Sequence, residues 1–330
     1  MLPERINERA TSIVKGSDMN AAWVFPGQGS QTVGMGHDLY VHSPTARAIF
    51  EQADEVLGFA LSHLCFEGPE TALTATENAQ PALLTVSIAL VRVLEEIGGA
   101  ALVRPLAVAG HSLGEYSALV AGGALDFATA LRLVRRRGEL MAAAHEGSMA
   151  AVIGLAQPDL EQICEQVNSG DHGGTVVIAN YNAPDQLVIS GSAAAVAQAG
   201  QIAKEHGAKR VLGLKVSAAF HSPLMQAAAE GMAHEIAQAE VRDLEVPLIA
   251  NVSAEPLRSA DEVRREVVTQ VTAPVRWIAS TEAMLAHGCT TFVEIGPGKV
   301  LTGLVRRIAP QARLVTLSSW ADVQAFVAQL

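Results

Sequence analysis

A serine between two glycines is the residue of this chain whose surroundings most strongly suggest chemistry. Gly110-His111-Ser112-Leu113-Gly114 has the pattern G-x-S-x-G, and it connects an apolar stretch at residues 106–109 to a helical one at residues 116–120. This order predicts a sharp strand-to-helix turn that exposes the Ser112 hydroxyl as a nucleophile. The glycines give the clearance that such a bend needs, and amides at the start of the helix would face an oxyanion. The alternative is a glycine-rich turn with a serine helix cap.

A nucleophilic serine needs a base, and His221 is the best placed of the ten histidines. It lies in a loop before a helix that Pro223 opens, at a seam between two parts of the chain, where active sites tend to form. An acid that would orient the histidine is not evident, because three aspartates that lie between Ser112 and His221, within residues 148–216, lack a strand-end position: Asp159, Asp171 and Asp185. We therefore expect a Ser–His pair that another acceptor orients.

An arginine lies where an apolar side chain is expected. On a helical wheel of residues 127–144 the apolar side chains share one arc, and Arg137 falls in its middle. Three further arginines share the opposite arc with Glu139, which indicates a solvated charged face: Arg132, Arg135 and Arg136. A buried arginine keeps its charge and needs an anionic partner. That partner is either a core acid or the carboxylate or phosphate of a substrate.

The elements that must position these residues follow an α/β order. After a flexible tail at residues 1–20, we expect a strand at residues 21–25 and then a glycine-rich loop, residues 26–31, with exposed amides. Further helices and strands are expected on both sides of the serine turn: helices at residues 44–56, 80–97 and 300–308, and strands near 247–251 and 291–295.

A second pattern begins at residue 148. Strands are expected at residues 149–155, 175–179, 186–190 and 210–216, with a turn at 182–185 and helices at 158–167 and 193–206. The order βαββαβ is the ferredoxin-like pattern. We therefore expect a ferredoxin-like subdomain, residues 148–216, inserted in a larger catalytic domain formed by residues 21–147 and 217–330.

Composition excludes several classes of function. The chain has 330 residues, 49% of them hydrophobic, and a net charge of −11, which argues against nucleic-acid binding and gives no attraction to an anionic membrane. An acidic partner would need a local basic patch. The three cysteines have no metal-ligand spacing, and we see neither a membrane-spanning run nor a signal peptide. We expect a cytoplasmic protein with reduced thiols.

Four ordered motifs resemble those of the malonyl-CoA:acyl-carrier-protein transacylase family. They are FPGQGSQ at residues 25–31, GHSLGEYS at 110–117, FH at 220–221 and GPGKVLTG at 296–303. The resemblance extends from residue 21 to residue 308. It implies an α/β-hydrolase-like large domain with a parallel sheet and a ferredoxin-like insertion, in agreement with the element order above.

The resemblance also implies roles for individual residues. Ser112 would be the acylated nucleophile and His221 its base. The backbone amides of Gln28 and Leu113 would form the oxyanion hole.

The resemblance implies roles for three further residues. Arg137 occupies the place of the arginine that binds the malonyl carboxylate. Gln270 occupies that of the glutamine whose carbonyl orients the histidine. Phe220 resembles the malonyl-selecting version of its loop, in which a bulky ring leaves little room for an α-methyl branch.

The implied reaction passes malonyl from malonyl-CoA to Ser112 and then to the phosphopantetheine thiol of an acyl carrier protein, without metal or cofactor, in a monomer. Fatty-acid synthesis, polyketide synthesis and malonate decarboxylation all remain open as its setting. A thioester hydrolase would use the same Ser112 and His221, but it would have no reason to keep a buried arginine for a substrate carboxylate. A non-catalytic docking protein would need neither nucleophile nor base.

Overall fold

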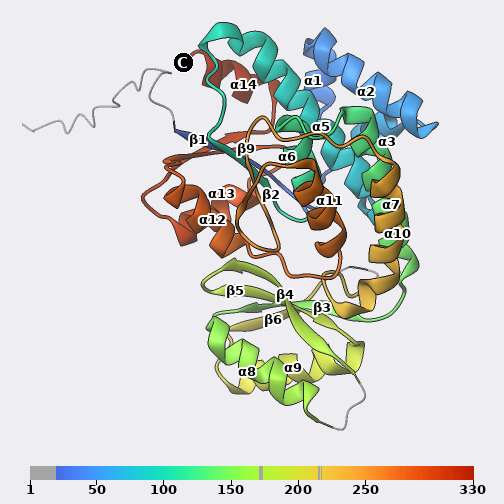
Figure 1. Ribbon diagram of the computed structural model, residues 1–330, viewed down its shortest axis with the longest axis vertical. Coiled ribbons are helices and arrows are strands. Elements are labelled where there is room, and N and C mark those ends of the chain that lie inside the picture. The colour runs from blue at the N-terminus through green and yellow to red at the C-terminus, as the bar shows by residue number, and fades with distance from the viewer. Residues whose placement is uncertain (1–19, 171–173, 215, 217) are drawn as a thin grey trace, which may run out of the picture.

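The computed structural model describes residues 20–170, 174–214, 216 and 218–330. Residues 1–19 of the predicted tail therefore lie outside the described residues. The same holds for Asp171, for residue 215 of a predicted strand and for residue 217 at the predicted subdomain boundary. The described residues form a larger part and a smaller part, each built around its own sheet (Figure 1). None of the helices in this portion of the chain is both long and apolar enough to cross a membrane.

A six-stranded sheet forms the centre of the larger part, in the order β10-β9-β1-β2-β7-β8. Its strands are β1 (Ala21–Phe25), β2 (Ala107–Gly110), β7 (Leu248–Ile249), β8 (Pro256–Leu257), β9 (Thr291–Ile295) and β10 (Arg313–Leu317). All neighbouring strands are parallel except β7 and β8. The loops after β1, β2, β7 and β9 therefore leave the sheet at the same edge.

Helices cover both faces of this sheet (Figure 1). Alternate residues of β1 point to opposite sides: Trp23 and Phe25 join the core that contains α5 (Thr76–Gly98) and α6 (Gly114–Ala121). Ala22 and Val24 pack against α12 (Trp277–Ala286) and α13 (Val300–Ile308). Burial on both faces explains why these strands are continuous apolar runs.

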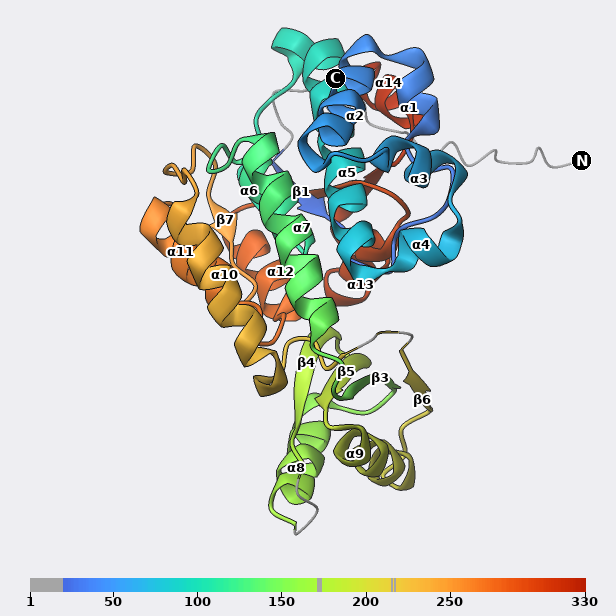
Figure 2. The ribbon, with the colours of Figure 1, turned by 90° about the vertical axis from the view of Figure 1, so that its right-hand side faces the viewer.

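The remaining helices of the larger part are α1 (His37–His42), α2 (Pro44–Leu57), α3 (Leu61–Glu67), α4 (Glu70–Thr74), α7 (Phe127–Ala143), α10 (Gln226–Gln238), α11 (Ala260–Thr269) and α14 (Trp320–Val327), with the 3-10 turns η2 (Gly99–Ala101) and η3 (Pro223–Met225). Helix α7 lies between α5 and α10 (Figure 2). This position makes α7 the link between the two helices.

Helix α5 begins at Thr76, four residues before the predicted start at residue 80. Pro81 lies inside it and has no N–H, so the carbonyl of Glu77 is left without its usual helical donor. Nη1 of Arg135, on α7, donates to this carbonyl at 3.0 Å. The contact between the two helices thus satisfies a group that the proline frees.

The smaller part has the predicted element order βαββαβ. It consists of β3 (Ser148–Ile153), α8 (Gln157–Asn168), β4 (Val176–Ala183), β5 (Gln186–Gly191), α9 (Ala193–Glu205) and β6 (Arg210–Gly213). The antiparallel sheet has the order β4-β5-β3-β6, and both helices cover one of its faces (Figures 1 and 2). Ala150 and Val152 point to these helices, whereas Met149 and Ala151 belong to the core of the larger part.

Strand β4 is longer than the prediction of residues 175–179, and only Pro184 and Asp185 form the turn. The strand continues because its end pairs with the larger part. The N–H of Tyr181 donates to the carbonyl of Val275 at 2.9 Å, and the N–H of Val275 donates to Ala179 at 2.8 Å. These bonds attach the smaller sheet beside the loop that carries Gln270.

Candidate active site

Ser112 lies on a tight turn between β2 and α6, with a φ of 51°. A Cβ on Gly110 would lie 1.9 Å from the carbonyl carbon of Gly114, and a Cβ on Gly114 would lie 2.0 Å from the carbonyl oxygen of Phe25. Only glycine fits at either position, as the sequence predicted. Helix α6 has no side-chain cap, so the alternative of Ser112 as a helix cap is wrong.

The His221 ring is buried, with Nε2 at 2.7 Å from the hydroxyl oxygen of Ser112. Its Nδ1 faces two backbone carbonyls, those of Gln270 at 2.9 Å and Ala273 at 3.0 Å. Because both partners are acceptors, Nδ1 carries the proton and Nε2 accepts from the serine. Burial, together with the charge of Arg137, lowers the pKa of His221 to about 3. The imidazole is therefore neutral and able to accept a proton.

Arg137 is only 1% exposed, as its place on the apolar arc predicted. Its Nη1 donates to Oε1 of Gln80 at 2.9 Å, and Nη2 donates to Oε1 of Gln270 at 2.8 Å and to Oγ of Ser112 at 3.1 Å. Across the described ranges, no Asp or Glu carboxylate lies within ion-pair distance of Arg137. The alternative that Arg137 forms a structural ion pair with a core acid therefore finds no acidic partner among the described residues. Its guanidinium donates there only to the neutral oxygens of Gln80, Gln270 and Ser112.

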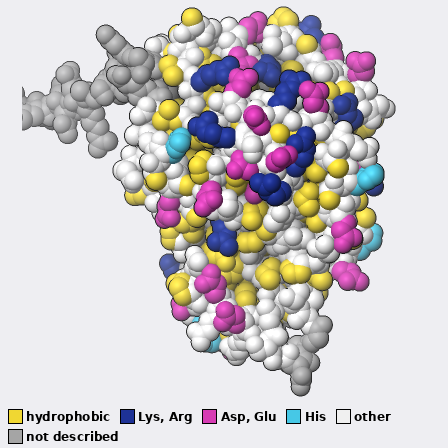
Figure 3. All heavy atoms as spheres, in the orientation of Figure 1, with side chains coloured by type: hydrophobic (Ala, Val, Ile, Leu, Met, Phe, Trp, Pro, Cys, Tyr) yellow, Lys and Arg dark blue, Asp and Glu magenta, His cyan; other side chains and the backbone are white. Residues whose placement is uncertain are grey.

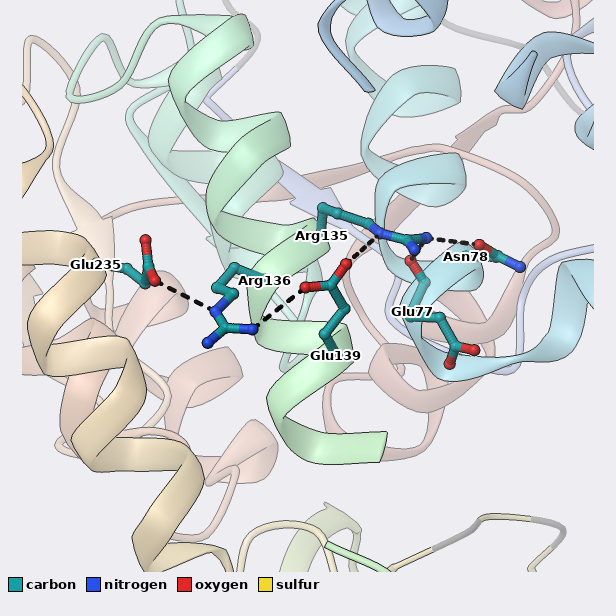
Figure 4. Close-up of polar contacts among 6 residues, drawn as sticks. All are labelled: Glu77, Asn78, Arg135, Arg136, Glu139 and Glu235. Carbon is teal, nitrogen blue, oxygen red and sulfur yellow. Dashed lines mark hydrogen bonds and ion pairs between the residues drawn. The ribbon is translucent and has the colours of Figure 1, made fainter. Parts of the chain in front are cut away.

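The interpretation of the other α7 arginines as a solvated charged face is confirmed for Arg132 and Arg136, which are exposed, but is wrong for Arg135, which is half-buried against α5. Arg135 donates to Glu139 at 2.8 Å and to Oδ1 of Asn78, on α5, at 2.7 Å; Arg136 donates to Glu235, on α10, at 3.2 Å (Figure 4). A helical wheel shows which side of α7 these side chains share, but it does not show that α5 and α10 pack beside that helix. Together they connect α7 to both neighbours on either side of Arg137.

A cavity of about 330 Å³ opens beside Ser112, where the two parts of the structure meet. Six of the seven predicted site residues line it: Gln28, Ser112, Leu113, Arg137, Phe220 and His221. The smaller part contributes Met149, Asn180 and Leu214. Gln270 lies behind this wall, in contact with both Arg137 and His221.

Two backbone amides at the cavity are available to a ligand. The N–H groups of Gln28 and Leu113 donate to no protein acceptor within the described part of the chain. Leu113 directly precedes α6, so its amide belongs to the positive end of that helix. Both amides can therefore bind an oxyanion that forms at the Ser112 side of the cavity.

Sequence reasoning missed several residues that hold the site together. Oδ1 of Asn251 accepts from the Ser112 N–H at 2.7 Å, and its Nδ2 donates to the Gly110 carbonyl at 2.7 Å. Its signal was its place after strand β7, because the carboxyl ends of parallel strands meet at one edge. The signal for Gln80 was a polar side chain within a helix that is buried on nearly every side.

The arrangement suits acyl transfer from a substrate that carries an anionic group. A hydroxyl lies against a neutral base, amides without a described protein acceptor lie beside it, and a guanidinium with no carboxylate of the described residues within ion-pair distance lies 3.1 Å from the hydroxyl oxygen. In the portion of the chain that the structure describes, no cluster of His, Cys, Asp and Glu could hold a metal ion.

Comparison with known proteins agrees with this chemistry. The malonyl CoA-acyl carrier protein transacylase of Bacillus subtilis is 46% identical over 300 residues, which cover 90% of this chain and 93% of that protein. The crystal structure of an acyl-carrier-protein-S-malonyltransferase from Bartonella henselae is 47% identical, with a TM-score of 0.89 over 94% of this chain and 99% of that one.

A third similar protein was solved with a partner. It is a malonyl-transacylase in complex with a type II PKS acyl-carrier protein, 40% identical, with a TM-score of 0.90 over 94% of this chain and 100% of that chain. The family model described as an acyl transferase domain matches residues 22–319. Because this match covers most of the sequence, the chain belongs to the acyl transferase family.

Proposed function

We propose that this acyltransferase moves a malonyl group from malonyl-CoA to the phosphopantetheine thiol of an acyl carrier protein, through an ester on Ser112. The observation that carries the proposal is Arg137. Among the described residues its buried guanidinium donates only to neutral acceptors, and it lies 3.1 Å from the serine oxygen. A malonyl group on that oxygen would bring its free carboxylate within reach of the guanidinium, which binds carboxylates through two parallel N–H donors.

In the first half-reaction, Nε2 of His221 takes the Ser112 proton while Oγ attacks the thioester carbonyl. The N–H groups of Gln28 and Leu113 hold the oxyanion of the tetrahedral intermediate. The intermediate collapses to the malonyl-serine ester, and His221 returns its proton to the leaving CoA thiolate. The Gln270 and Ala273 carbonyls hold the imidazole in the required tautomer throughout.

In the second half-reaction, a carrier-protein thiol gives its proton to His221 and attacks the ester carbonyl. Collapse of the second intermediate returns the proton to Ser112 and releases the malonyl thioester. Each bond is made and broken by the serine, the histidine and the two thiols, so the proposed reaction needs neither metal nor cofactor. A similar protein solved with its acyl-carrier protein supports the choice of acceptor.

Three further parts of the proposal concern setting. Action as a monomer is a prediction from sequence. The cytoplasmic location is supported by the three free, buried cysteines, which are typical of a reducing compartment. Polyketide synthesis is supported as a setting by the similar protein that was solved with a type II PKS acyl-carrier protein, and fatty-acid synthesis and malonate decarboxylation stay open.

Phe220 is proposed to favour malonyl over branched substrates. Its ring lines the cavity beside His221 and is almost fully buried. A pocket that discriminates one methyl group does so by about 1–3 kcal/mol, so Phe220→Ala should shift the preference and not invert it completely. Acylation by methylmalonyl-CoA and malonyl-CoA, measured in competition, gives this ratio; an unchanged ratio would assign the selection to other side chains.

The Arg137→Ala variant tests the proposed function. Loss of a charged contact in a desolvated site should cost about 2–5 kcal/mol of transition-state stabilisation. This corresponds to a fall in malonyl kcat/KM of some 30-fold to several thousand-fold. Acetyl-CoA has no second carboxylate and should lose little. The measurement is the acetyl-to-malonyl ratio of acylation rates together with a denaturation curve. An unchanged ratio with lower stability would show that Arg137 serves the core and not the substrate.

A further inference from the structure

A buried carboxylate outside the proposed reaction contacts the residues behind the site. Glu115 lies on α6, three residues after Ser112, and is 1% exposed. Its Oε1 accepts from the N–H of Asn251 at 2.8 Å and from Nδ2 of Asn251 at 3.0 Å, and its Oε2 accepts from Nε2 of Gln270 at 2.5 Å. Within the described ranges it has no ion-pair partner. Such a group is costly to bury, and core packing gives no reason for it.

The contact with Gln270 decides which way its side-chain amide points. Oε1 of Gln270 faces the guanidinium of Arg137, while Nε2 donates to Glu115 and to the Ser112 carbonyl at 2.9 Å. An amide side chain fits a site of this shape in either orientation, so its neighbours select one. Glu115 offers only acceptors to this amide. It therefore holds Nε2 on its own side and leaves Oε1 for Arg137.

We propose that Glu115 is a positioning residue of the acyltransferase: through the amide orientation of Gln270 it supplies the acceptor that aligns Arg137 with the substrate carboxylate. The proposal rests on the proposed function, because it concerns how Arg137 is held. If Gln270 turned over, its N–H groups would face the N–H groups of the guanidinium. Arg137 would then lose the Nη2 contact at 2.8 Å that fixes it beside Ser112.

The neighbouring Glu266 does not change this assignment. Its carboxylate is buried against Glu115 and accepts from the N–H of Val252 at 2.9 Å, and its backbone carbonyl, which a side-chain substitution leaves in place, accepts from the N–H of Gln270 at 2.8 Å. Burial raises the pKa of both carboxyl groups, and their mutual repulsion favours one proton held by the pair. Both oxygens of Glu115 face N–H donors, Oε1 those of Asn251 and Oε2 that of Gln270, so the oxygen toward Gln270 is an acceptor in this arrangement.

Glu115→Gln is the decisive substitution because it keeps the shape and adds one donor group. The single oxygen of the new amide will stay with the two Asn251 donors, which turns its NH₂ toward Gln270 and forces that amide to rotate. We expect malonyl kcat/KM to fall about 10- to 100-fold, as for a lost hydrogen bond to a charged group, with much less change for acetyl. Glu115→Asp keeps only acceptors and should retain the parental ratio of the two substrates.

Glu266→Gln is the matched control, since it removes a carboxylate from the same buried pair without touching Gln270. We expect it to keep the parental acetyl-to-malonyl ratio. In a Gln270→Ala background, Glu115→Gln should not change the ratio further, because the two residues act in series. Thermal denaturation of each variant confirms that the fold is retained.

Two results would overturn the proposal. One is a folded Glu115→Gln enzyme with the parental acetyl-to-malonyl ratio. The other is a change in this ratio on Glu115→Gln that is equally large with Gln270 present and in the Gln270→Ala background. If Glu115→Gln does not fold, the test passes to Gln270→Ala, which should itself raise the acetyl-to-malonyl ratio. A parental ratio in Gln270→Ala would reject the proposal. Failure of the proposed function is distinct, since the parent enzyme would then form no malonyl adduct at all.

Discussion

At the scale of single residues, the site depends on a neutral histidine and a cationic arginine that contact the same hydroxyl. The pKa of His221 falls from its ordinary value of 6.5 to about 3 because the ring is buried, and the nearby guanidinium acts in the same direction. In that pH interval His221 binds one more proton in the unfolded chain than in the folded enzyme. The contribution of this residue to stability therefore falls as the pH drops from 6.5 toward 3, while the base stays neutral.

This shift predicts an unusual pH dependence. Single-turnover acylation by malonyl-CoA should stay level below pH 6.5 and fall only as the pH approaches 3, as long as the enzyme is folded. His221→Ala should lower the plateau by the roughly 10²–10⁴-fold typical of a lost general base. Rapid-quench rates with circular dichroism at each pH provide the test. An acidic limb centred near 6.5 in the folded parent would contradict the buried, neutral state of His221.

How far the sequence predicts the site differs among its residues. Ser112, His221 and Arg137 were found from residue type and position, because a strand-to-helix turn, a seam loop and a helical wheel are local patterns. Gln270 and Phe220 required the resemblance to a family. Glu115 and Asn251 were missed as contributors, because their hydrogen bond joins residues 136 positions apart. In the sequence, Glu115 is one letter of the motif at residues 110–117, and only the structure shows which side chains it contacts.

At the scale of elements, helix α7 is held in position by close contact with the start of α5. A Cβ on Gly138 would lie 2.6 Å from the Cα of Glu77 and 2.8 Å from the carbonyl oxygen of Thr76. Polar contacts of Arg135 with Glu77 and Asn78 support the same arrangement, and Arg136 connects α7 to α10 on its other side (Figure 4). The depth at which Arg137 enters the cavity thus depends on how closely two helices approach.

Gly138→Ala should separate these helices. We expect a loss of about 1–3 kcal/mol in the free energy of unfolding, as for an overpacked core, together with reduced malonyl transfer. The control is Gly303→Ala on α13, where an added Cβ meets nothing within 4 Å and helix propensity should give a gain of up to about 1 kcal/mol. Urea denaturation of both variants measures the difference. Equal stability of the two variants would show that the α5–α7 contact tolerates a methyl group.

The order of elements was predictable, whereas some of their ends were not. The βαββαβ order and the helix at residues 300–308 follow from local periodicity, and the structure confirms both. The early start of α5 and the late end of β4 depend on partners elsewhere in the chain. Helix α5 starts at Thr76, beside Gly138 of α7, and β4 continues through Tyr181, which pairs with Val275. No local sequence pattern near Thr76 or Tyr181 indicates these contacts.

At the scale of the whole molecule, the two parts share one core and one cavity. Met149 and Ala151 of the smaller sheet pack with the larger part, and the cavity beside Ser112 has walls from both. On the face shown in Figure 3, Lys and Arg side chains lie interspersed with Asp and Glu over the larger part. The net charge of −11 thus coexists with local basic side chains, which any acidic partner would need.

The most direct test of the account is the mass of the enzyme after mixing with malonyl-CoA in the absence of carrier protein. We predict one malonyl adduct, located on Ser112 by peptide mapping and removed when a carrier protein with a phosphopantetheine thiol is added. Ser112→Ala should form no adduct while keeping the parental fold. A malonyl adduct that persists in Ser112→Ala, or a folded parent enzyme that forms none, would contradict transfer through this serine.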